Sequence, residues 1–112
     1  MSMSDIKDFP VEQGTESVYA DLGYPDASDM QVKAELAREI AQILIDRRLT
    51  QQHAATILGM PQPKLSEMLR GKFRGISQAK MIECLNRLGR DVDIVVRKAK
   101  RQAEGHTQVV VV

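Results

Sequence analysis

The chain has 112 residues, a formal net charge of +1 and a single cysteine. This length allows one domain with tails and one modest core. The lone Cys84 excludes an internal disulfide, and because it lies in an apolar helical run we expect a small buried side chain there rather than a reactive thiol. No run approaches the roughly 18 apolar residues of a membrane helix and no signal-peptide pattern opens the chain, so we expect a cytoplasmic protein.

The small net charge hides a strong segregation of charge along the chain. Residues 1–32 contain seven acidic residues and one basic residue, whereas residues 64–101 contain eleven basic residues and four acidic ones. Phosphate binding needs only a local array of lysine and arginine, so a net charge near zero does not exclude a nucleic-acid partner.

The N-terminal part of the chain predicts little regular structure. Residues 1–16 are polar and acidic, and we expect a flexible arm because they cannot bury enough apolar surface to become ordered. Residues 17–29 contain Tyr19 and Tyr24 among small and acidic residues. They predict a short helical turn packed on the domain, although the two tyrosines could instead anchor a protein partner.

The first long helix is predicted over residues 30–48. Apolar residues recur there at helical spacing, from Val32 to Leu44, and charged residues including Lys33, Glu35 and Asp46 are expected on the opposite, exposed side. Arg47 and Arg48 come at the C-terminal end of this helix. We expect them to interact there with the helix dipole rather than with DNA.

Residues 49–72 predict two short helices joined by a tight turn. Thr50 can cap the first helix, since its hydroxyl can accept a hydrogen bond from an unpaired backbone N–H group. Gly59 stands just past the end of that helix, where a positive φ is favoured. The second helix begins after Pro61 with Gln62 and Pro63, and proline is tolerated in a first turn.

The second of these helices has one apolar and one polar face. Its apolar face consists of Leu65, Met68 and Leu69 at spacings of three and four residues. The other face displays Gln62, Lys64, Ser66, Glu67 and Arg70. Two crossed helices with polar side chains at the start of the second form a helix-turn-helix, which fits the major groove of DNA.

After this motif the sequence predicts a loop, a helix and a β segment. The loop 71–75 carries Lys72 and Arg74, which either contact phosphates or are simply solvated, and Phe73, which we expect to pack inward. A helix capped by Ser77 should run to about Leu88 and end at Gly89. Residues 91–97 alternate with a period of two and predict a strand, and residues 107–112 are a second β-prone segment.

The strand needs a partner because an unpaired edge must be covered. The two β-prone segments could form a hairpin, or the strand could pair with its copy in a second subunit. We favour dimerisation through Val92, Ile94 and Val96, which share one face of the strand.

The sequence shows no sign of catalytic or metal chemistry. His53 and His106 have no partner at metal-ligand spacing, and no nucleophile, phosphate-loop or zinc-protease motif occurs. We expect no enzyme activity, no metal and no cofactor.

The central motif resembles the Cro/CI-type (XRE-like) helix-turn-helix regulators. The pattern is carried by Thr50, Gln51, Ala55, Leu58, Gly59, Gln62, Ser66, Gly71 and Lys72. The flanking stretches VYADLGYPDA and LGRDVDIVVRKAK, with PQPKLSEMLRGKFRGIS between them, resemble the HigA-like antitoxin branch over roughly residues 18–112. One departure is Pro61, which stands where many relatives have a capping serine or threonine.

This resemblance implies a mainly α protein with a compact four- to five-helix lambda-repressor-like domain and a C-terminal β-strand or hairpin. We therefore divide the chain into a flexible acidic arm (1–16), a DNA-binding domain (17–90) and a C-terminal dimerisation segment (91–112). The predicted function is a dimeric, sequence-specific DNA-binding repressor on a palindromic operator. Base edges would be read by Gln62, Lys64, Ser66 and Glu67, and phosphates would be held by Gln51, Arg70, Lys72 and Arg74.

The HigA-like branch further implies an antitoxin that neutralises a RelE/HigB-type ribonuclease toxin and represses its own operon. The acidic arm suits such a role, since toxins of this kind are generally basic. Two alternatives remain at this point: a stand-alone or phage-type regulator without a toxin, and a protein-interaction module that has lost DNA binding.

Overall fold

The computed structural model describes residues 27–100 and 104–112. The acidic arm expected over residues 1–16 and nearly all of the tyrosine-containing segment lie outside these ranges. The described part contains four helices and is mainly helical, as predicted. They are α3 (Ala27–Asp46), α4 (Gln51–Leu58), α5 (Gln62–Leu69) and α6 (Gln78–Arg87).

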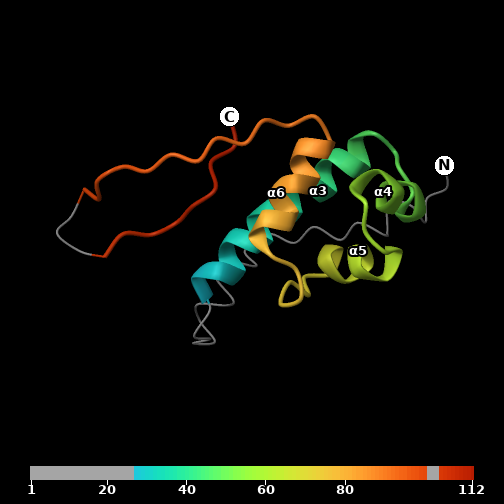
Figure 1. The fold of residues 1–112 in the computed structure, drawn as a ribbon, viewed down its shortest axis with the longest axis horizontal. Helices are drawn as coiled ribbons and strands as arrows, with labels where there is room; N and C mark the ends of the chain where they lie inside the picture. Colours follow the sequence, from blue (N-terminus) through green and yellow to red (C-terminus); the bar gives the residue numbers. More distant parts are fainter. Residues whose placement is uncertain (1–26, 101–103) are drawn as a thin grey trace.

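Helices α3 and α6 lie side by side and run in the same direction, and α4 and α5 are grouped beside them (Figure 1). Polar contacts join the two long helices at both ends. Near their starts the side-chain amide of Gln78 donates to Asp29 at 2.6 Å. At their ends the guanidinium of Arg47 donates to the carbonyl of Leu88. These contacts fix the long helices as a frame against which the two short helices pack.

Helix α3 begins three residues earlier and ends two residues earlier than the apolar pattern predicts. It ends because Arg48 adopts a left-handed conformation with φ 55°, and the N–H of Leu49 then bonds back to the carbonyl of Leu44 at 3.0 Å. Arg47 does act at a helix end, but the carbonyl that it contacts belongs to Leu88, the residue after α6, rather than to its own helix.

The other helix boundaries follow the signals in the sequence. The hydroxyls of Thr50 and Ser77 accept N–H groups of the first turns of α4 and α6, at 3.1 and 3.0 Å. Gly59 and Gly89 follow the ends of these two helices with positive φ. Pro61 precedes α5 and provides no side-chain cap, as predicted, because the proline ring carries no hydrogen-bonding group.

One apolar core lies between the four helices. Phe73, in the loop after α5, is buried within it as expected. Among the described helices, none combines the length and the apolar character that crossing a membrane requires. The largest fully buried side chains are those of Ile40, Leu44, Leu58, Leu65, Met68, Met81, Leu88 and Cys84.

The predicted C-terminal strand is not present: residues 90–100 and 104–112 contain no β-strand. Figure 1 shows the first of these segments leading away from the helices and the second returning towards them. Ile94 and Val96 are 79% and 92% exposed, while Val92 and Val109 pack against the core. The alternating pattern was therefore misleading for a single chain, because a strand also requires a neighbouring backbone to bond with.

Candidate nucleic-acid interface

The turn between α4 and α5 is built on three small residues. Ala54 and Ala55 are buried in α4, which allows the second helix to approach closely. Gly59 has φ 65°, and its N–H group bonds to carbonyls of the last turn of α4. The chain then reverses through Met60, whose N–H bonds to the carbonyl of Ala55 at 3.1 Å. The turn thus fixes the angle at which α5 leaves α4.

Helix α5 separates its residues into a buried and an exposed face, as its sequence predicts. Leu65, Met68 and Leu69 are buried. The residues predicted to read bases lie on the other face: Gln62, Lys64 and Glu67 are exposed and Ser66 is half-buried. The exposed face of α5 therefore offers a donor and acceptor amide, a cation, a hydroxyl and an acceptor carboxylate to a ligand.

Four basic residues lie on or directly after α5. Lys64, Arg70, Lys72 and Arg74 are all exposed, and Glu67 is the only acidic residue between them in the sequence. The loop that carries Lys72 and Arg74 is anchored to α5, since the N–H of Lys72 bonds to the carbonyl of Glu67 at 2.9 Å. The start of the loop is therefore held against the C-terminal end of α5.

Lys64 also lies close to this loop. A Cβ atom added at Gly75 would stand 3.2 Å from the ammonium of Lys64. The absence of a side chain at residue 75 therefore provides the room that the lysine occupies. This links the first turn of α5 to the loop on the same side of the molecule.

Gln51 differs from the other residues predicted to contact phosphates. Its side chain begins α4 and is only 9% exposed. Its side chain therefore lacks the exposure that a direct phosphate contact requires. Arg70, Lys72 and Arg74 do have the expected exposure.

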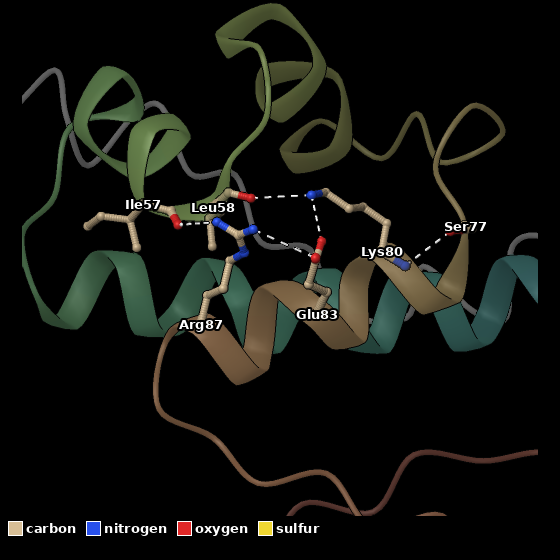
Figure 2. A network of polar contacts seen from close by, with 6 residues as sticks. All are labelled: Ile57, Leu58, Ser77, Lys80, Glu83 and Arg87. Atoms are coloured by element: carbon tan, nitrogen blue, oxygen red, sulfur yellow. Dashed lines mark hydrogen bonds and ion pairs between the residues drawn. The ribbon is translucent and has the colours of Figure 1, made fainter.

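A network of polar side chains on α6 braces the end of α4 (Figure 2). The ammonium of Lys80 donates to the carbonyl of Leu58 at 3.4 Å, and the guanidinium of Arg87 donates to that of Ile57 at 3.3 Å. Glu83 lies between the two cations, 2.7 Å from the ammonium and 3.7 Å from the guanidinium. Its hydrogen bond with Lys80 is the main reason why the pKa of Glu83 is lowered.

This brace was not foreseen from the sequence. The carbonyls at the end of α4 and the cations of α6 that donate to them are about 20 to 30 residues apart in the chain. The only available signal was the spacing of Lys80, Glu83 and Arg87, which places the three charges on one face of α6. That spacing does not reveal which helix end the cations cover.

Lys33 is buried, contrary to the prediction from the sequence. It was expected on the exposed side of the first helix, but it is 6% exposed. Its ammonium lies 3.1 Å from the carboxylate of Asp29 and donates to the carbonyl of Phe73 at 3.3 Å. The hydrogen bond from Gln78 and, secondarily, the contact with Lys33 lower the pKa of Asp29.

Within residues 27–100 and 104–112, no three side chains of the metal-binding types come together as a site. Cys84 is buried, and burial raises the pKa of its thiol. Among the described residues, the exposed polar face of α5 and the basic loop after it therefore form the candidate binding surface.

Comparisons with known proteins agree with this geometry. Residues 18–97 match the model of a helix-turn-helix domain family. A solved structure, described provisionally as an XRE family transcriptional regulator, is similar to this chain with a TM-score of 0.73 and 38% identity. The similarity covers 79% of this chain and all of that one. A comparison with curated protein sequences found no match.

Proposed function

This chain belongs to the helix-turn-helix domain family of transcriptional regulators, and we propose that it acts as a sequence-specific DNA-binding repressor. It is a regulator and not an enzyme. The observation that carries the proposal is the composition of α5. Its apolar face packs against the core, and its polar face is exposed and is followed in the sequence by the exposed Arg70, Lys72 and Arg74.

In this proposal the first turns of α5 enter the major groove. Gln62 and Lys64 would reach purine edges, and Ser66 and Glu67 would bond to neighbouring bases. Gln62 and Lys64 come from the first turn of α5, the end that reaches deepest into the groove in proteins of this kind, and Ser66 and Glu67 come from the turn that follows. Pro61 leaves the N–H groups at the start of α5 without a side-chain cap, which favours an electronegative neighbour there.

Arg70, Lys72 and Arg74 would hold phosphates and set the register of α5 on the duplex. Gln51 would contribute less than these three residues, because its side chain is buried. These contacts carry no sequence information by themselves. They should supply most of the affinity and make it fall steeply with salt.

The two roles can be separated with a pair of lysine variants. Lys64→Ala should reduce discrimination between a preferred duplex and its scrambled version by about 1–3 kcal/mol, because a base contact is lost. Lys72→Ala should weaken binding to both duplexes equally and reduce the slope of log K against log salt by about 1. Fluorescence anisotropy titrations measure both quantities. Equal weakening of both duplexes by Lys64→Ala would refute its role in base reading.

We further propose that two copies bind a palindromic operator with half-sites roughly 34 Å apart. The exposed Ile94 and Val96, on a segment with no strand partner in the single chain, support pairing of residues 91–97 between subunits. Val92 would contribute less to this pairing, since it packs against the core of its own subunit.

The double variant Ile94→Lys/Val96→Lys tests this pairing. It should sediment as a monomer and lose operator affinity, because lysines would replace the apolar side chains that join the subunits. Asp93→Lys, a change on the same exposed segment but the opposite side of the period-two pattern, serves as the control and should remain dimeric. A double variant that still sediments as a dimer would refute the pairing.

The finer role that we propose is that of a type II antitoxin repressing its own operon. It is supported by the resemblance to HigA-like proteins and by the seven acidic residues within the first 32, which would complement a basic RelE/HigB-type ribonuclease. Deletion of residues 1–16 should weaken toxin binding and leave operator binding intact. An unchanged toxin affinity would refute the role of the arm, and a neighbouring reading frame without a small basic ribonuclease would favour a stand-alone regulator.

A further inference from the structure

Lys33 is the one buried charged side chain among the residues that the structure describes. Taking an ammonium out of water costs several kcal/mol unless it is well paired. An apolar side chain of similar length would fill the same space without that cost, so packing alone gives no reason for a lysine here. The partners of the ammonium are therefore the informative feature.

These partners join three separate parts of the chain. The ammonium of Lys33 bonds to Asp29 in the first turn of α3, and Asp29 accepts the amide of Gln78 at the start of α6. On its other side the ammonium donates to the carbonyl of Phe73, 40 residues away, in the loop after α5. The same carbonyl accepts the N–H of Ile76 at 3.0 Å, which closes the loop into a turn.

The loop held in this way carries two of the proposed phosphate-binding side chains. Lys72 and Arg74 are exposed on either side of the buried Phe73. The loop also makes room for Lys64, whose ammonium lies against Gly75. A shift of the Phe73 carbonyl would therefore move Lys72 and Arg74, and with them Gly75, against which Lys64 lies.

We infer that Lys33 is a positioning residue for DNA binding: it fixes the carbonyl of Phe73 so that Lys72 and Arg74 meet the phosphates in the register in which α5 enters the groove. This inference rests on the proposed function. Lys33 itself does not contact DNA, because it lies beneath the surface.

The test uses the full chain and a duplex selected by the wild-type protein from a randomised pool. Lys33→Met removes the ammonium and keeps most of the length of the side chain. It should weaken binding and reduce the slope of log K against log salt by about 2, since each phosphate contact contributes roughly 0.9 to that slope. Val32→Ala, a truncation of the adjacent buried residue, is the control, and it should lower thermal stability without changing the slope.

A second comparison separates positioning from a general loss of structure. In a Lys72→Ala/Arg74→Ala background, Lys33→Met should cause no further change in affinity or slope, because the side chains that it positions are already gone. An unchanged slope for Lys33→Met alone, or an equal loss in both backgrounds, would overturn the inference.

If Lys33→Met does not fold, Gln78→Ala gives a milder form of the same test. It removes the hydrogen bond to Asp29 and leaves the ammonium in place, so the slope should fall by less than for Lys33→Met and amide exchange of Ile76 should become faster. No change in either quantity would overturn the inference. A wild-type protein whose binding to duplex DNA is independent of salt would instead refute the proposed function itself.

Discussion

Gly59→Ala should destabilise the protein for two separable reasons. Gly59 has φ 65°, a conformation that costs an alanine about 1–2 kcal/mol. A Cβ atom at this position would also stand 2.8 Å from the guanidinium of Arg87. This side chain would have to move, which would break its hydrogen bond to the carbonyl of Ile57.

The displacement of Arg87 should cost less free energy of unfolding than the backbone strain. The side chain of Arg87 is 46% exposed, so water replaces part of what it loses, and we expect about 0.5–1 kcal/mol for its displacement. The two effects together predict a loss of about 2 kcal/mol. In a domain of this size, that corresponds to a fall in Tm of roughly 8–16 °C.

Urea denaturation of a double-mutant cycle with Arg87→Ala separates the two effects. In the Arg87→Ala background the cost of Gly59→Ala should fall to the backbone strain alone. Gly71→Ala is the matched control: Gly71 also has positive φ, but nothing lies within 4 Å of an added Cβ, so its cost should not depend on Arg87. A cost of Gly59→Ala that is the same with and without Arg87 would refute this reasoning.

Three further predictions concern single residues. Cys84 should react with iodoacetamide only after denaturation, because it is buried and its pKa is raised; rapid labelling of the native protein would contradict this. Arg48→Gly should raise stability by up to about 1 kcal/mol in thermal unfolding, since it relieves a left-handed conformation; a lower Tm would contradict this. Asp29, whose pKa is lowered on folding, stabilises the protein above its unfolded pKa near 3.8 and loses this effect as the pH falls below that value. Asp29→Asn should therefore be less stable than wild type at neutral pH and lose less stability on acidification.

The parts of the fold that depend on neighbours in the sequence were predicted well. Thr50, Ser77, Gly59 and Gly89 mark helix ends through bonds and dihedral angles within a few residues, so local chemistry determines them. The apolar face of α5 follows from a spacing of three and four residues. The polar face of α5 was predictable for the same reason, because it consists of the residues that this spacing leaves out of the apolar face.

The errors concern contacts between residues that are distant in the sequence. The burial of Lys33 depends on Phe73 and Gln78, which reach it from other elements. Residues 91–97 have an alternating pattern, but pairing requires a second backbone that a single chain does not provide here. The burial of Gln51 likewise depends on packing around the start of α4 rather than on its own neighbours.

The most direct test of the account is selection of duplexes from a randomised pool by the full-length protein, followed by salt titration of the selected duplex. We expect the wild-type protein to enrich a two-fold symmetric sequence whose affinity falls steeply with salt, and we expect Lys64→Ala to enrich that sequence less strongly. Failure of the wild-type protein to enrich any sequence, or an affinity independent of salt, would contradict the claim that α5 reads DNA.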